Sequence, residues 1–229
     1  MRIPSLRLLT LAVPLLLLLA ACSPGRHERM VRQLSSLHAL NQADSLLTDD
    51  SLAQALADYF DRHGTPNEQM EAYYLLGRTH ADRGEAPAAL AAYHDAIDRA
   101  DTAAADCDYS QLCRVYAQMA DVFYKQNLLS YQMECLNKSI SYALKGRDTL
   151  MALNSYGHKM VCYGRLGMTD SVIVLGERLY RQYTLIGYPQ IGAQYYGFTI
   201  KRYLAKGEYE KAKECMDAYE NGSGIDYLS

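Results

Sequence analysis

Apolar residues recur at helical spacing along nearly the whole chain after residue 29. They return every three or four positions, which is the period of an amphipathic α-helix, and no stretch alternates apolar and polar residues as a half-buried strand would. The prolines of this region, Pro66, Pro87 and Pro189, stand between apolar runs, where a helix can begin. The pattern therefore predicts an all-α protein.

The first 21 residues follow a different pattern. Arg2 and Arg7 give a basic start, an apolar run follows over residues 8–21, and small residues close it. This is the layout of a secretory signal, and the run is shorter than the roughly 20 apolar residues that a spanning helix needs. We therefore expect residues 1–21 to be a signal peptide that is removed.

The end of this run, Leu19-Ala20-Ala21-Cys22, resembles the lipobox of bacterial lipoproteins. In that family the cysteine thiol is alkylated by diacylglycerol before cleavage, and the new amino terminus is then acylated. The resemblance implies that Cys22 is the lipidation site and the first mature residue. Several acyl chains anchor a protein stably, whereas one alone is marginal. The alternative is an ordinary secretory signal followed by a chance cysteine.

The residues after the cysteine bear on where the anchored protein would lie. Ser23 follows Cys22 in place of an aspartate, and residues 22–28 contain no acidic run that resembles a surface-export signal. By analogy with Gram-negative lipoproteins, we expect attachment to the cell envelope, at the outer membrane and facing the periplasm. Residues 22–28 are expected to form a short polar tether.

A weak internal repeat with a period of about 40 residues runs through the rest of the chain. Four similar phrases, each with a turn residue at its second or third place, are "DRGEAPAAL" at 82–90, "KQNLLSYQM" at 125–133, "RLGMTDSVI" at 165–173 and "AKGEYEKAK" at 205–213. The turn residues are Gly84, Asn127, Gly167 and Gly207. Self-similarity at such a period predicts stacked helical units.

These phrases resemble tetratricopeptide (TPR) repeats, in which two antiparallel helices flank a glycine turn. The best match consists of Tyr73, Leu76, Gly77, His80 in the aromatic slot, Gly84, Ala89, Tyr93 and Ala96. Small residues such as Gly77 and Ala89 belong where the two helices cross most closely, and tyrosines fill wider gaps. The resemblance implies a TPR-like α-solenoid of about five antiparallel hairpins. We expect a degenerate hairpin over residues 29–66, four TPR-like hairpins over 67–221 and a tail over 222–229.

Composition and motifs argue against catalysis and nucleic-acid binding. The chain contains no HExxH, Walker, GxGxxG or GxSxG motif, so we expect no enzyme activity, no cofactor and no metal. Loss of Arg2 and Arg7 with the signal leaves 21 basic and 26 acidic side chains, without a basic stripe. Five cysteines remain after Cys22, an odd number without CxxC spacing, and we interpret them as small apolar filler on helices.

In the TPR family, the first helix of each hairpin lines a concave groove. The groove positions that the resemblance implies for a protein-binding role are Tyr74, Arg78, Arg114, Asp121, Tyr124, Asn154, Gln194 and Lys201, together with Ala117, Gly157 and Gly197. This polar and aromatic mixture suits an extended peptide or a partner helix. It lacks the ordered Lys/Asn/Arg set that clamps a terminal carboxylate in some relatives. An ordinary solvated concave surface is the alternative.

We therefore expect a lipid-anchored, non-catalytic scaffold for protein–protein interaction in the envelope. The alternatives are a lipoprotein that resembles those of the outer-membrane β-barrel assembly machinery, a glycan-binding lipoprotein, or the sensory half of a membrane regulator that has been shortened. The last follows from the absence of a polar capping helix after the final repeat. Asp-Ser/Thr pairs before an apolar residue, at Asp44, Asp50, Asp101, Asp148 and Asp170, are interpreted as helix caps, with O-glycosylation as the alternative.

Overall fold

The computed structural model describes residues 24–223, and ten helices follow one another along this part of the chain with no strand between them. The expected all-α class is therefore confirmed for the described residues. The predicted signal peptide, the lipidation site Cys22 and residues 224–229 of the predicted tail lie outside them. No helix within residues 24–223 has the length and apolar character needed to span a membrane.

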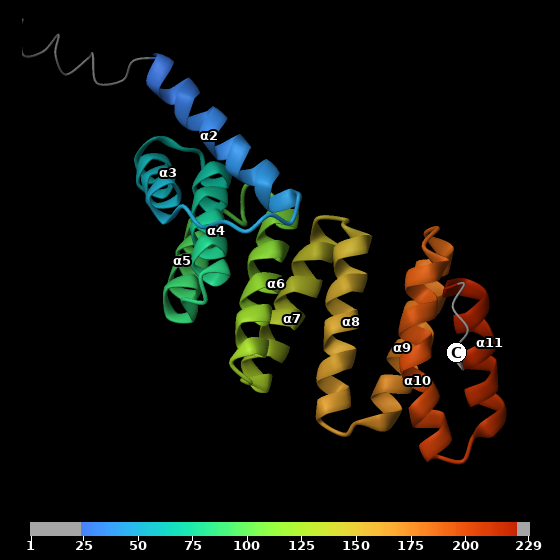
Figure 1. Cartoon of the computed structure of the whole chain (residues 1–229). Helices are drawn as coiled ribbons and strands as arrows, with labels where there is room; N and C mark the ends of the chain where they lie inside the picture. Colours follow the sequence, from blue (N-terminus) through green and yellow to red (C-terminus); the bar gives the residue numbers. More distant parts are fainter. Residues whose placement is uncertain (1–23, 224–229) are drawn as a thin grey trace, which may run out of the picture.

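The helices form five consecutive pairs that stack side by side (Figure 1). The pairs are α2 (Pro24–Gln42) with α3 (Asp50–His63), α4 (Pro66–Asp82) with α5 (Ala86–Arg99), α6 (Tyr109–Lys125) with α7 (Leu129–Lys145), α8 (Thr149–Arg165) with α9 (Thr169–Leu185), and α10 (Pro189–Ala205) with α11 (Tyr209–Ser223). The first pair departs from the others, because α2 packs only lightly on its partner α3 and no more closely on it than on α4, whereas the helices of every later pair pack extensively on each other. The sequence of this first pair also lacks a clear repeat, in agreement with its different packing.

The predicted tether is wrong from residue 24 onward, because α2 begins at Pro24. Proline favours the first position of a helix, where its missing N–H costs nothing. Glu28 and Arg32 form an i,i+4 ion pair at 3.6 Å, and the His27 ring hydrogen-bonds the Tyr59 hydroxyl at 3.0 Å. Polar residues that were expected to be a tether therefore form the first turns of a packed helix.

The turns inside the hairpins have the geometry that the repeat predicted. Gly84, Asn127, Gly167 and Gly207 have φ angles of 78°, 60°, 71° and 75°. Glycine occupies this left-handed region without strain, and asparagine is the next most tolerant residue. The last two connections between hairpins repeat the same conformation at Arg147 and Gly187, with φ angles of 56° and 88°. An arginine in such a position gave no sequence signal.

The close approach expected between helices of one hairpin is present at Gly77. A Cβ atom there would lie 2.4 Å from Cε1 of Tyr93, which is completely buried. Ala89 is also completely buried. His80 departs from its expected core position, because its ring is half-buried and its Nδ1 lies 2.7 Å from a carboxylate oxygen of Glu85. In this hairpin, the position that is aromatic in the TPR pattern therefore holds His80, which makes a polar contact.

Aspartates cap helices at some of the expected positions only. Asp49 and Asp148 accept hydrogen bonds from backbone N–H groups in the first turns of α3 and α8. Asp44 instead has a φ of 54° outside any helix, Asp101 caps a turn, and Asp170 lies within the first turn of α9. The cap interpretation is therefore correct at Asp148, is shifted by one residue near Asp50, and is wrong at the other three.

The cysteines and the apolar core follow the stacking. Cys113, Cys135, Cys162 and Cys215 are buried on helices, as expected, whereas Cys107 is half-buried in the connection between α5 and α6. One large apolar cluster covers chiefly α2 to α7, and smaller clusters cover α8 to α11. The core is thus a series of neighbouring layers.

Candidate functional site

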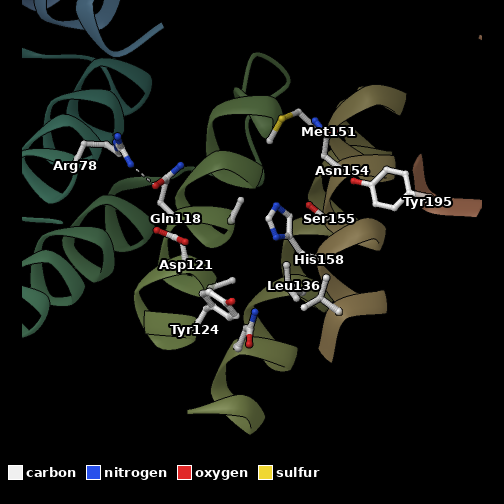
Figure 2. A pocket seen from close by; sticks show the side chains of 14 residues that line it. Arg78, Gln118, Asp121, Tyr124, Leu136, Met151, Asn154, Ser155, His158 and Tyr195 are labelled. Carbon is white, nitrogen blue, oxygen red and sulfur yellow. Dashed lines mark hydrogen bonds between the residues drawn. The ribbon is translucent and has the colours of Figure 1, made fainter. Parts of the chain in front are cut away.

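The first helices of successive hairpins, α4, α6, α8 and α10, share one face of the stack, and a cavity of about 510 Å³ opens on it between α6 and α8. Figure 2 shows Gln118, Asp121 and Tyr124 of α6 on one side, opposite Asn154 and His158 of α8. The second helix of the hairpin, α7, also contributes to the lining. We call this the central cavity.

Amide side chains from three helices line the central cavity. Gln118 comes from α6, Gln132 from α7 and Asn154 from α8. Gln132 is only 3% exposed, and its Oε1 has no hydrogen-bond partner. Asn154 accepts a hydrogen bond from the Tyr183 hydroxyl at 2.5 Å through its Oδ1. Each amide carries both a donor and an acceptor, which matches the two polar groups of a peptide unit.

A second cavity, of about 490 Å³, lies between α2, α4 and α6, and we call it the amino-terminal cavity. Arg78 and Gln118 line both this cavity and the central one. The Arg78 guanidinium donates to Gln118 Oε1 at 2.5 Å, to Asn41 Oδ1 at 3.1 Å and to Asp82 Oδ1 at 3.1 Å. With all its nitrogens engaged, Arg78 forms a fixed partition between the two cavities.

The wall of the amino-terminal cavity contains donors that are poorly satisfied. Gln111 is 3% exposed and its Nε2 lacks a partner, while its Oε1 accepts a long hydrogen bond of 3.4 Å from Arg114. Across the cavity, His38 Nδ1 lies 2.5 Å from Glu71 Oε1. Burial raises the pKa of the Glu71 carboxyl, and the neighbouring His38 opposes that rise.

A third cavity, of about 530 Å³, lies along the middle of α10 next to α11, and we call it the carboxy-terminal cavity. Gln194, Lys201 and Arg202 supply its polar groups. Phe198 is 60% exposed beside them and supplies an apolar surface. This cavity therefore combines cations with an aromatic ring.

The eight predicted groove residues all lie on the shared face, but in three separate cavities. Arg78, Asp121, Tyr124 and Asn154 line the central cavity; Tyr74, Arg78 and Arg114 line the amino-terminal cavity; Gln194 and Lys201 line the carboxy-terminal cavity. Tyr74 is only 3% exposed, and its hydroxyl accepts a hydrogen bond from Asn41 Nδ2 at 3.2 Å. Tyr74 is thus chiefly part of the core.

Several lining residues were absent from the prediction. Gln118 stands four positions after Arg114 and three before Asp121, so helical spacing alone places it on the same face. Gln132 belongs to a second helix, and His38 and Asn41 belong to α2, which carries no clear repeat. Gly157 was expected on the open groove, but a Cβ there would lie 2.2 Å from the Tyr195 hydroxyl, so it is a packing position.

The polar groups of this face suit hydrogen bonding to a ligand. Within residues 24–223, no three His, Cys, Asp or Glu side chains converge on a point where a metal ion would be held. Tyr124 is 47% exposed at the rim of the central cavity, and the Arg165 guanidinium carbon lies 5.4 Å from its ring centroid. Amides and an aromatic ring are groups that protein–protein interfaces commonly use.

Comparison with known proteins shows the fold. No family model and no curated protein matches the chain. The TPR-like repeats of a kinesin light chain from Podosopora anserina superpose with a TM-score of 0.64 at 12% identity, covering 88% of this chain and 98% of that one. BtubC (BKLC) from P. vanneervenii gives 0.59 at 16% identity, over 86% of this chain and 89% of its own. The predicted TPR-like α-solenoid is thereby confirmed.

Proposed function

We propose that the protein is a non-catalytic docking scaffold that binds an extended segment of a protein partner along the shared face of α4, α6, α8 and α10. The observation that carries this proposal is the set of amides in the central cavity, above all the buried, unpartnered Oε1 of Gln132. A buried polar group without a partner is costly, and a peptide N–H would satisfy it. TPR-like folds commonly bind protein partners, which supports the same role.

A photo-crosslinking amino acid at position 118 tests the docking surface. Gln118 lines two cavities, whereas Lys138 is exposed on α7 and lines none of the three cavities of the shared face, so position 138 is the matched control. We expect a discrete adduct from position 118 that is absent from position 138. The adduct should weaken when Gln132 and Asn154 are changed to alanine.

The same experiment identifies the outcome that contradicts the proposal. Adducts of equal yield from positions 118 and 138, or an adduct that the Gln132→Ala and Asn154→Ala changes leave intact, would show that this face is not the docking surface. A further variant, with Arg114, Asp121 and Lys201 changed to alanine, tests whether the contact extends over all three cavities. Circular dichroism of each variant checks that the helices remain.

The proposal also places the scaffold on the bacterial envelope through lipid at Cys22. Its support is the lipobox-like segment Leu19-Ala20-Ala21-Cys22 after an apolar run of signal-peptide length. Metabolic labelling with a palmitate analogue should label the full-length chain, and Cys22→Ser should abolish both labelling and cleavage. Label retained in Cys22→Ser would remove the anchor at this residue.

A further inference from the structure

Three arginines converge where the start of α2 meets the end of α3. Arg26 and Arg29 come from α2 and Arg62 from α3, and they line a shallow cavity of about 620 Å³ together with Tyr59 and Asp58. All three arginines are exposed. They form a local positive site on a chain whose formal net charge is −3. We call Arg26, Arg29 and Arg62 the arginine cluster.

We infer that the arginine cluster binds the phosphate groups of anionic lipid headgroups and holds this end of the solenoid against the membrane. In the cell this role rests on the proposed lipid attachment at Cys22. The sequence separates Cys22 from the first residue of α2, Pro24, by one residue, so the connection spans about 7 Å at most. Arg26 and Arg29 would then lie at headgroup depth.

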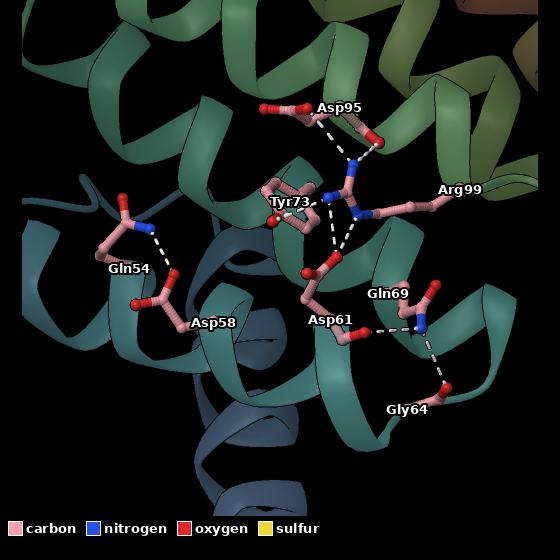
Figure 3. Close-up of polar contacts among 8 residues, drawn as sticks. All are labelled: Gln54, Asp58, Asp61, Gly64, Gln69, Tyr73, Asp95 and Arg99. Atoms are coloured by element: carbon pink, nitrogen blue, oxygen red, sulfur yellow. Dashed lines mark hydrogen bonds and ion pairs between the residues drawn. The ribbon is translucent and has the colours of Figure 1, made fainter.

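The cluster has charges that are free to meet a ligand. Among the described residues, none of its three arginines forms an ion pair, whereas Arg32, Arg83 and other arginines do. The neighbouring carboxylates are already engaged, as Figure 3 shows. Asp61 pairs with Arg99 at 2.7 Å, and Asp58 accepts a hydrogen bond from Gln54 at 2.8 Å. The paired N–H donors of a guanidinium group have a geometry that fits two oxygens of a phosphate group.

The two helix ends that carry the cluster are held in fixed register. Tyr59 of α3 hydrogen-bonds His27 of α2, and its ring centroid lies 4.8 Å from that of His63. The Arg26 guanidinium carbon lies 5.7 Å from the Tyr59 ring centroid. The helix segments that carry the arginines therefore do not need to be ordered by the ligand, which reduces the entropic cost of binding.

Vesicle binding of the unlipidated chain tests the inference directly. A chain from residue 23 to residue 229 keeps every described residue and has no lipid, so any binding comes from the protein surface. We expect it to bind vesicles that contain phosphatidylglycerol, to bind pure phosphatidylcholine vesicles far less, and to dissociate as salt rises. Each arginine near an anionic surface contributes about fivefold, so Arg26→Gln/Arg29→Gln/Arg62→Gln should bind on the order of 100-fold more weakly.

The matched control changes the same net charge elsewhere. Arg147, Arg178 and Arg181 are exposed arginines of the segment from the α7–α8 connection to α9, and changing all three to glutamine should leave vesicle binding nearly intact. Equal losses in both triple variants would overturn the inference in favour of an effect of net charge. The single change Arg29→Gln, with an expected loss of about fivefold, provides a milder variant.

A titration with inorganic phosphate separates lipid from a free anion. The membrane assignment would be overturned if the protein bound phosphate saturably, lost this binding when the arginine cluster was changed, and showed no preference for phosphatidylglycerol vesicles. Failure of lipid attachment is measured independently by the labelling of Cys22 in the full-length chain. The vesicle result therefore stands or falls without it.

Discussion

Glycines at the helix crossings of this solenoid lie directly beneath a side chain of the facing helix. A Cβ on Gly77 would meet the Tyr93 ring, one on Gly157 the Tyr195 ring, and one on Gly176 the Thr199 methyl group, each within 2.6 Å. Real Cβ contacts do not occur at such distances. The missing methyl group at these positions is therefore what allows the ring or branched side chain to occupy the crossing.

Substitution of Gly77 by alanine should destabilise the protein. The new Cβ would lie 2.4 Å from Cε1 and 2.5 Å from Cδ1 of Tyr93, and this ring is completely buried. Overpacking of this kind costs about 1–3 kcal/mol, more than the helix propensity that alanine gains over glycine. Urea unfolding followed by circular dichroism measures the change. Gly25→Ala, with no atom within 4 Å, is the control and should not destabilise; equal stabilities would disprove the crossing argument.

The buried thiol of Cys135 predicts a pH dependence of stability. Burial raises its pKa to about 11 from the ordinary 9.0. The folded state thus keeps the proton that the unfolded chain releases above pH 9, so this contribution to stability is complete below pH 9 and is lost as the pH rises to about 11. Relative to Cys135→Ala, the wild-type protein should lose on the order of 2 kcal/mol over this interval. Urea unfolding curves in reductant at several pH values measure it, and parallel losses in both proteins would contradict it.

At the scale of the element, the turns decide how each hairpin closes and how hairpins are joined. From α6 onward, each turn places one residue in the left-handed region, and glycine supplies it at Gly167, Gly187 and Gly207. Arg147, between α7 and α8, adopts a φ of 56° with a full side chain. A residue other than glycine or asparagine pays a conformational cost there of about 1 kcal/mol. The backbone at Arg147 is therefore strained in the folded protein.

Relief of that strain is measurable by an exchange of residue types. Arg147→Gly should raise the free energy of unfolding by about 1 kcal/mol, because glycine adopts the left-handed conformation freely. Gly167→Ala is the reciprocal variant: its φ is 71° and no atom lies within 4 Å of the added Cβ, so only backbone strain can lower its stability. Thermal unfolding of the pair checks both signs. Changes of the same sign in the two variants would refute a backbone origin.

The sequence predicted those helices and turns that follow from local patterns, namely apolar spacing and turn residues. Gly84, Gly167 and Gly207 mark turns that require a left-handed residue, and the apolar spacing between them fixes the helices. The start of α2 was not predictable in this way. Its first turn is polar and is fixed by contacts across a sequence separation of 32 residues, as between His27 and Tyr59. Long-range contacts of this kind leave no periodic trace in the local sequence.

The sequence predicted which face of the solenoid carries the candidate site, but not that this face is divided into separate cavities. The resemblance to TPR repeats predicted that Arg114, Asp121 and Asn154 lie on the first helices of their hairpins, and they line the cavities of the shared face. The partition into separate cavities depends on the Arg78–Gln118 hydrogen bond, which joins residues 40 positions apart. Gln132 enters the central cavity from a second helix, against the simple rule that first helices form the groove. Side-chain partners across helices are set by packing, which residue spacing does not encode.

At the scale of the whole molecule, the stack is a chain of neighbouring layers with polar ends. The outermost helix of the described residues, α11, exposes Glu210, Lys213, Glu214 and Asp217. As the second helix of the last predicted hairpin, α11 therefore gives that hairpin a polar outer face. The apolar clusters change between α7 and α8, where the small residues Ala143 and Ala152 pack together with Cys113. Stability should accordingly be divided along the stack.

Amide hydrogen exchange of two variants, each with one core side chain truncated, tests this division of stability. Tyr203→Ala removes a ring that is 2% exposed in the cluster of α9 to α11, and Phe60→Ala removes one that is completely buried in the cluster of α2 to α7. Each truncation costs about 3–5 kcal/mol locally. Because each hairpin contacts only its neighbours, Tyr203→Ala should lower amide protection in α9 to α11 and spare α4 and α5, while Phe60→Ala should do the reverse. Uniform loss of protection in either variant would mean that the solenoid unfolds as one cooperative unit, and the layered description of its core would then be wrong.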